Sequence, residues 1–346
     1  MKNKFTLSQM MNIRSENLHF LRFVASIFVI VGHAFVLCDS NYYEVVYWLT
    51  GKEITLGRLA VAFFFFASGL FIAKSIEKKN SFKEYFKARC IRIFPLLWIV
   101  IIITVVFGVF VSEKEVIEYY TNLDTGLYLL NCILILKHEL PGVFQNNYYG
   151  PVVNGSLWTL PLEFLCYIVC FVCYHTGMMK PRVIRKTLPL CVISAVLGVL
   201  ANKILHVSLI EDFLCLCIIF YIGMVYYVLR NEIEFSLKTL IALFFFFVIT
   251  IIFNISWLGI LMFFPYALSW LFFTERQIDK KYSFLGDYSY AMYLCAFPIQ
   301  QLFIHLFGGN MNPYINIVLT IFVALLCAIV LIEGVEKRII NKSKRS

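Results

Sequence analysis

The chain has 346 residues, of which 61% are hydrophobic and only 15% are charged, and its mean hydropathy is +0.80. A soluble domain cannot cover such a composition with polar surface, whereas repeated apolar segments of about 20 residues, each able to cross a bilayer, explain it. The net charge of +9 comes from basic residues in short connections, which indicates membrane topology and not nucleic-acid binding. We therefore predict an all-α polytopic membrane protein whose partners include the lipid bilayer and no nucleic acid.

Ten apolar segments are long enough to be membrane helices. They cover residues 18–38, 57–76, 93–112, 157–175, 187–206, 209–229, 236–254, 256–274, 289–307 and 313–334. The first segment has no small-residue cleavage site after it, so we expect it to remain as a helix. No internal repeat, low-complexity linker or appended soluble domain is visible, and residues 1–346 are expected to form a single membrane domain.

Lysine and arginine predict the orientation of these helices. They concentrate in residues 2–14, 74–92, 180–186 and 342–345, which share one side of the membrane if there are ten spans. Because basic connections remain in the cytoplasm, both termini are predicted to be cytoplasmic. The opposite side carries acidic residues, namely Asp39, Glu44, Glu53, Glu113, Glu115, Glu118 and Asp124.

One long outer connection, about residues 113–156, contains two unusual stretches. Residues 127–136 are apolar but too short to span, which favours a re-entrant or interfacial piece. Residues 145–151 are polar and aromatic, and they could either face a sugar or lie at the membrane interface with tyrosines as anchors. Asn154 begins an N-glycosylation pattern that is too short to decide anything.

The eleven cysteines lie mostly within apolar runs. Cys170 and Cys173 form a C-x-x-C inside a predicted membrane helix, with only His175 nearby. We interpret these cysteines as small buried apolar residues, and we predict no metal site.

The first apolar helix contains two ionisable side chains, Arg22 and His33. They are eleven residues apart, which is close to three turns, so they share one face and are separated by ~16 Å along the axis. Such groups are rare inside membrane helices because a charge in hydrocarbon is costly, and they often mark function. The structural alternative is that Arg22 snorkels to the headgroups and His33 bonds a neighbouring carbonyl group.

This arginine–histidine spacing resembles the R-x10-H motif in the first helix of the membrane acyltransferase-3 family, whose members transfer acyl groups, often acetyl, onto sugars. Four further segments resemble family segments and follow in the family order: FFFASGL at 64–70, RCIRIFP at 89–95, LWTLPLE at 157–163 and SYAMYL at 289–294. The chain departs from the family at three positions. Ala88 replaces a frequent arginine, Ala296 replaces a frequent histidine, and Arg338 replaces the proline of a terminal E-x-P motif.

The resemblance implies an integral membrane O-acyltransferase of the acetyltransferase type in the inner membrane of a bacterium. The acyl donor would be acetyl-CoA or another acyl-CoA, bound as a co-substrate and not as a permanent cofactor. The acceptor would be a hydroxyl of a cell-envelope or exported polysaccharide, or of its lipid-linked sugar precursor. Ala296 bears on the handling of this acceptor more than on His33.

The residues of these motifs suit distinct roles in acyl transfer. His33 is expected to be the general base, and Glu163, at a similar depth, to hold its tautomer. Glu163 could instead be a buried carboxylate that is paired with a basic residue or kept protonated. Arg22, together with Arg89 and Arg92, is expected to bind the phosphates of the donor. Ser68 and Trp158 are the candidate substrate-binding residues that could stabilise the oxyanion.

A function of another class remains open. A transporter or flippase for a lipid-linked sugar or an anionic solute would use intramembrane Arg22, His33 and Glu163 equally well, although no inverted repeat is visible. A non-catalytic scaffold would leave the Arg22–His33 pair without use. The sequence contains no motif for nucleotide hydrolysis, dinucleotide binding, zinc proteolysis or a hydrolase nucleophile elbow.

Overall fold

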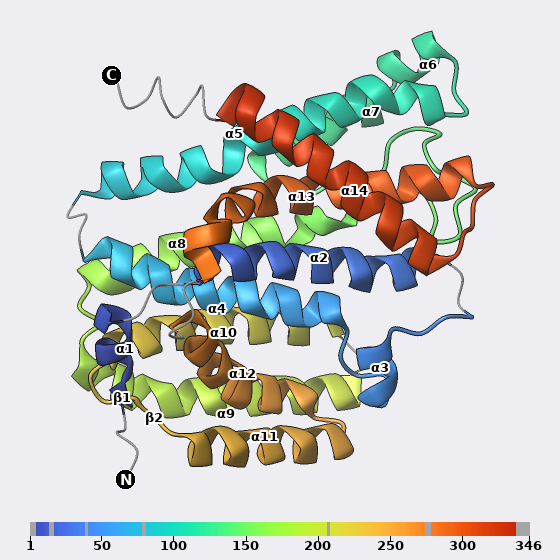
Figure 1. The fold of residues 1–346 in the computed structure, drawn as a ribbon. Coiled ribbons are helices and arrows are strands. Elements are labelled where there is room, and N and C mark those ends of the chain that lie inside the picture. The colour runs from blue at the N-terminus through green and yellow to red at the C-terminus, as the bar shows by residue number, and fades with distance from the viewer. Residues whose placement is uncertain are drawn as a thin grey trace. The chain divides into compact units, whose positions relative to one another are not determined.

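The computed structural model describes residues 5–13, 17–38, 41–77, 81–205, 208–273 and 278–336 (Figure 1). Several residues used above, including Asp39, Arg338 and the basic residues at 2–4, 14, 78–79 and 342–345, lie outside this description. The described chain is almost entirely helical. Its strands are β1 (Phe5–Thr6) and β2 (Glu234–Phe235), which pair antiparallel. The all-α prediction is confirmed.

In the described part, a helix occupies each of the ten predicted apolar segments. These helices are α2 (Leu18–Leu37), α4 (Leu56–Ile76), α5 (Phe82–Gly108), α8 (Thr159–His175), α9 (Pro181–Leu205), α10 (Ser208–Val228), α11 (Leu237–Ile252), α12 (Ser256–Phe272), α13 (Ile278–Leu306) and α14 (Pro313–Leu331). Helices α5, α9 and α13 begin several residues before the predicted segments. Their first turns are rich in lysine, arginine or other polar residues, which favour helix but carry no hydropathy signal.

Short helices lie between and beside the long ones. They are α1 (Leu7–Ile13), α3 (Val45–Leu49), η1 (Val109–Val111), α6 (Val116–Thr121), α7 (Leu123–Tyr128), η2 (Leu129–Ile133), η3 (Gly155–Trp158) and the π-helix η4 (Ile332–Glu336). The apolar stretch 127–136 forms no long helix. Helix η2 ends before Leu134, whose φ of 65° is left-handed. The side chain of Asn131 forms hydrogen bonds with the backbone of Tyr128 and Lys137 around this turn.

Five helices in the described part are long and apolar enough to cross a membrane, judged by length and composition. They are Leu18–Leu37, Leu56–Ile76, Phe82–Val111, Gly155–His175 and Pro313–Gly334. Three shorter apolar helices accompany them, at Asp212–Val228, Leu237–Ile252 and Ser256–Phe272. These helices indicate a multi-pass membrane protein. The count of ten spans and the cytoplasmic side of both termini stay predictions.

The chain divides into two compact units. The first unit contains residues 1–25, 45–85 and 162–286, and the second contains residues 26–44, 86–161 and 287–346. Four helices, α2, α5, α8 and α13, contribute residues to both units. The single membrane domain over residues 1–346 therefore stays a prediction.

The first unit is built on a close crossing of α4 and α10 at two glycines. A Cβ atom at Gly69 would lie 2.0 Å from the carbonyl oxygen of Phe220, and one at Gly223 would lie 2.4 Å from that of Phe66. Only glycine permits this approach of the two backbones, as in small-residue contacts between membrane helices. Gly69 follows Ser68 directly, so the FFFASGL segment serves the packing of this unit.

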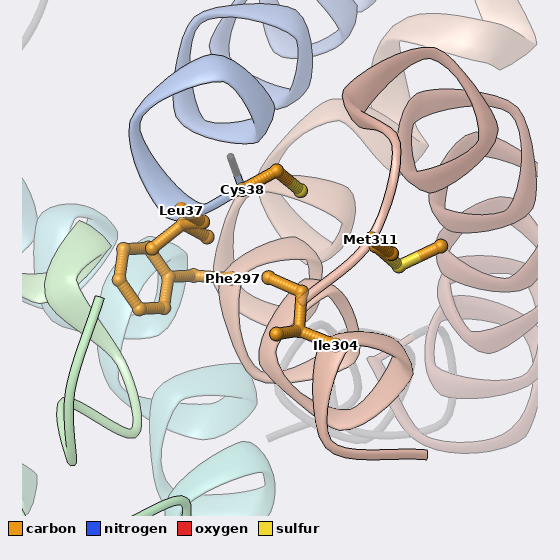
Figure 2. Close-up of a cluster of buried hydrophobic side chains, with 5 residues drawn as sticks. All are labelled: Leu37, Cys38, Phe297, Ile304 and Met311. Carbon is orange, nitrogen blue, oxygen red and sulfur yellow. The ribbon is translucent and has the colours of Figure 1, made fainter. Parts of the chain in front are cut away.

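The second unit closes around the end of α2. Figure 2 shows a cluster of buried side chains in which Leu37 and Cys38, at the end of α2, meet Phe297 and Ile304 of α13 and Met311 before α14. These residues are at most 8% exposed. The cluster fixes the turn of α2 that follows His33.

Candidate active site

His33 lies in the second unit against an aromatic ring. Its imidazole meets Phe297 at a centroid distance of 5.2 Å and an interplanar angle of 75°, which is an edge-to-face contact. The Nδ1 atom is buried and has no hydrogen-bond partner in the described part of the chain, while the residue as a whole stays partly exposed. A buried polar atom without a partner is uncommon in proteins and is found at catalytic positions.

A buried amide pair holds the turn of α2 that precedes His33. Gln300 donates its Nε2 hydrogens to the carbonyl oxygen of Ile30 at 3.0 Å and to Oδ1 of Asn316 at 3.0 Å. Asn316 in turn donates to the carbonyl oxygen of Gln300 at 3.2 Å, and both amide side chains are 0% exposed. Because hydrogen bonds are directional, this network fixes the rotation of α2 at His33.

The SYAMYL segment of α13 anchors three other elements of the second unit. The Tyr290 hydroxyl donates to the carbonyl oxygen of Ile93 in α5 at 3.0 Å. The Tyr293 hydroxyl donates to that of Ser156 in η3 at 2.5 Å. Met292 accepts a weak contact of 3.9 Å from the Ser26 hydroxyl in α2. This segment of α13 therefore contacts α2, α5 and η3.

The aromatic stretch at 145–151 also depends on α13. Asn147 donates to the backbone oxygen of Gln301 at 2.8 Å and to its side-chain oxygen at 2.9 Å. Gln301 donates back to the carbonyl oxygens of Gly150 at 3.1 Å and of Val152 at 2.8 Å. The loop is thus fixed on both sides of Tyr149, whose ring lies 6.3 Å from Phe297.

Two of the predicted site residues meet in the first unit. Ser68 donates its hydroxyl hydrogen to Oε1 of Glu163 at 3.2 Å, and the Tyr167 hydroxyl donates to the same oxygen. Tyr85 donates to the backbone oxygen of Tyr167 at 2.8 Å. Glu163 is therefore held by two hydroxyl groups. His33 belongs to the other unit, and the predicted pairing of Glu163 with it stays a prediction.

The three predicted phosphate-binding arginines lie on two helices. Arg22 is half-buried on α2, in the part of that helix that belongs to the first unit. Arg89 and Arg92 are half-buried, three residues apart on α5 and so on one face. The Arg92 guanidinium lies 5.5 Å from the Tyr290 ring centroid, which is a cation–π contact.

Trp158 ends η3 in the second unit and is half-buried. Gly155, which begins η3, packs against Phe297, because a Cβ there would lie 2.7 Å from the Phe297 ring. The glycosylation pattern at Asn154 has a structural use instead. This side chain is 2% exposed, donates to the Leu294 carbonyl oxygen and accepts from the Ser156 amide.

Sequence reasoning missed the residues that support the site. Phe297, Gln300 and Gln301 come directly after the departure at Ala296, which is 0% exposed, and no motif marks them. The polar pair Gln300–Gln301 inside an apolar helix was the available signal. In the described part, no three His, Cys, Asp or Glu side chains come together as a metal site would need.

The apolar helices, with an imidazole and a carboxylate among them, define the class: a multi-pass helical membrane protein with buried polar centres. Residues 15–333 match the family model of the acyltransferase domain, and the chain belongs to this acyltransferase-3 family. The predicted resemblance is confirmed.

A curated relative, an O-acetyl transferase of Shigella phage Sf6, is 36% identical over 149 residues. The aligned segment covers 43% of this chain and 42% of that protein, so the match spans less than half the length of the relative. No solved structure matches the chain.

Proposed function

We propose that the protein is an O-acetyltransferase that moves an acetyl group from acetyl-CoA to a hydroxyl of a cell-envelope or exported polysaccharide, or of its lipid-linked precursor. The bacterial inner membrane is the proposed location. One observation carries the proposal, in a chain that belongs to the acyltransferase-3 family. The His33 imidazole packs edge-on against the Phe297 ring, and its buried Nδ1 atom has no hydrogen-bond partner among the described residues.

His33 acts as the base in the proposed step. The acceptor hydroxyl loses its proton to the imidazole while its oxygen bonds the carbonyl carbon of the thioester. The carbon–sulfur bond then breaks, and the imidazolium returns the proton to the departing thiolate. The products are the O-acetyl ester and free coenzyme A, and His33 is neutral again.

Arg22, Arg89 and Arg92 are proposed to bind the phosphates of the donor. Arg22 lies eleven residues before His33 on α2, which corresponds to about three turns of helix. Guanidinium groups bind phosphate oxygens with two parallel hydrogen bonds.

The oxyanion that forms during the attack needs a hydrogen-bond donor. Of the two candidates, Ser68 already donates its single hydroxyl hydrogen to Glu163. Trp158 belongs to the same unit as His33, and its indole N–H is a donor only. We therefore favour Trp158 for this role.

Mass spectrometry of envelope glycans tests the proposed function. The host strain, a deletion strain, and deletion strains that carry wild-type protein, His33→Ala or His305→Ala should be compared. His305 is the matched control, because it also lies in the second unit against a phenylalanine, Phe144, at 5.9 Å. The glycans should lose O-acetyl groups in the deletion strain, and wild type and His305→Ala should restore them.

His33→Ala should restore less than about 1% of the acetyl groups, since a general base contributes ~10²–10⁴-fold. Equal amounts of both variants in the membrane fraction exclude a folding defect. Full restoration by His33→Ala would remove the proposed base. Glycans that are absent from the cell surface but acetylated inside the cell would indicate a transporter instead.

A further inference from the structure

We infer that Tyr149 is a binding platform for the acceptor, on which a pyranose ring of the glycan stacks beside His33. This inference rests on the proposed function and deepens it, because it assigns the acceptor side of the site. Three features of the second unit carry it: the position of the Tyr149 ring, the rigidity of its backbone, and the buried polar atoms of the same unit.

Phe297 is the shared neighbour of Tyr149 and His33. Its ring lies 5.2 Å from the imidazole and 6.3 Å from the Tyr149 ring, with interplanar angles of 75° and 72°. Tyr149 and the proposed base therefore contact the same ring. It is also 45% exposed, so part of the tyrosine is open to a ligand.

The backbone around Tyr149 is held more firmly than a membrane-interface anchor requires. Asn147 and Gly150, on either side of it, are bonded to Gln301, and the Tyr148 amide donates to the Gly309 carbonyl oxygen at 2.7 Å. Gly150 has a φ of 96°, which a residue with a side chain rarely adopts. A tyrosine that only anchors a loop among lipid headgroups does not need a fixed backbone. A tyrosine on which a sugar ring stacks does need one, because the ring must keep its orientation toward the ligand.

Several buried polar atoms of the second unit have no hydrogen-bond partner among the described residues. In the described part of the chain, Nδ1 of His33, Oγ of Ser156 and Oδ1 of Asn147 are buried and lack a partner. Ser156 is 1% exposed and follows Gly155, the residue against the Phe297 ring, and Asn147 is 5% exposed. A partly exposed tyrosine ring, in a unit whose described residues also hold unpartnered polar atoms, suits a ligand with apolar C–H faces and several hydroxyls, which is the chemistry of a sugar ring.

The test is the acceptor dependence of acetyl transfer by purified protein in liposomes. The donor is radiolabelled acetyl-CoA, and the acceptor is the polysaccharide extracted from the deletion strain. Tyr149→Ala should raise the apparent KM for the polysaccharide about 5- to 10-fold, the size expected for the loss of one aromatic stacking contact, and leave the KM for acetyl-CoA unchanged. Tyr149→Phe should behave as wild type, because the ring remains.

Tyr148→Ala is the matched control, since Tyr148 is the adjacent tyrosine and is 49% exposed. Its KM for the polysaccharide should stay within twofold of wild type. An unchanged acceptor KM in Tyr149→Ala, or an equal rise in Tyr148→Ala, would overturn the inference. If Tyr149→Ala does not fold, Tyr149→Leu retains an apolar side chain without the ring and gives the same reading. No transfer by the wild type would refute the proposed function itself, and the platform with it.

Discussion

At the scale of single residues, the sequence located the ionisable groups but not their partners. Arg22 and His33 are visible because charges are rare in apolar helices. The hydroxyl of Ser68 on Glu163, and the His33 and Tyr149 rings against Phe297, join residues from distant parts of the chain. Helical periodicity gives the face of a helix but not the element that covers it, so these contacts needed the structure.

Arg22 should affect donor binding more than the chemical step. Lysine keeps the positive charge but loses the planar group that binds phosphate with two bonds, so Arg22→Lys should raise the apparent KM for acetyl-CoA. Arg22→Ala should raise it further, by about 10- to 100-fold, which corresponds to the ~1.5–3 kcal/mol of a hydrogen bond to a charged group. The measurement is the donor-concentration dependence of transfer in liposomes.

The exposed Arg182, near the start of α9, provides the control for Arg22, and Arg182→Ala should leave the donor KM unchanged. If Arg22 only snorkels to the headgroups, lysine will replace it without loss, since both side chains reach them. An unchanged donor KM in folded Arg22→Ala would therefore return this residue to a structural role.

At the scale of elements, the apolar segments predicted every long helix in the described chain but placed some helix starts too late. Hydropathy follows lipid exposure, while helix formation continues into the polar first turns of α5, α9 and α13. The motif segments also contribute to the packing of the helices. FFFASGL supplies the glycine of the α4–α10 crossing, and SYAMYL supplies the anchors of the second unit.

The crossing of α4 and α10 predicts a large difference between two glycine substitutions. Gly69→Ala would place a methyl group 2.0 Å from a backbone oxygen that cannot move without its helix. We expect a loss of about 1–3 kcal/mol or more in the free energy of unfolding, as for other overpacked sites. The measurement is the unfolding midpoint of each protein in detergent, read as the temperature at which half of the protein is no longer monodisperse.

Gly126 in α7 is the control for this substitution, because nothing lies within 4 Å of a Cβ built there. Gly126→Ala should be neutral or stabilise by up to about 1 kcal/mol, since alanine reduces the freedom of the unfolded chain. Equal unfolding midpoints for Gly69→Ala and wild type would show that the two helices do not approach as described.

At the scale of the whole molecule, composition was sufficient to predict a helical membrane protein, and the motif order predicted its family. The division into two units was not visible, because it cuts through α2, α5, α8 and α13 and leaves no mark in composition.

The topology with ten spans and cytoplasmic termini makes a prediction for cysteine labelling. In a cysteine-free background, cysteines that replace the exposed Glu115 and Glu118 should react with a membrane-impermeant maleimide in intact cells. Cysteines that replace the exposed Lys83 and Arg182 should react only after permeabilisation. Glu44 would be a poor reporter, because it is 3% exposed. Labelling of position 83 in intact cells would contradict the cytoplasmic side predicted for the basic residues 74–92.

The buried amide pair of α13 and α14 also bears on how the chain enters the membrane during synthesis. In the described part, α14 qualifies as a membrane span by length and composition, and α13 does not. Gln300 emerges from the ribosome 16 residues before its partner Asn316. Until then its amide lacks that partner, which in hydrocarbon is unfavourable. We therefore expect α13 to integrate together with α14, whose Asn316 completes the hydrogen bonds of the Gln300 amide.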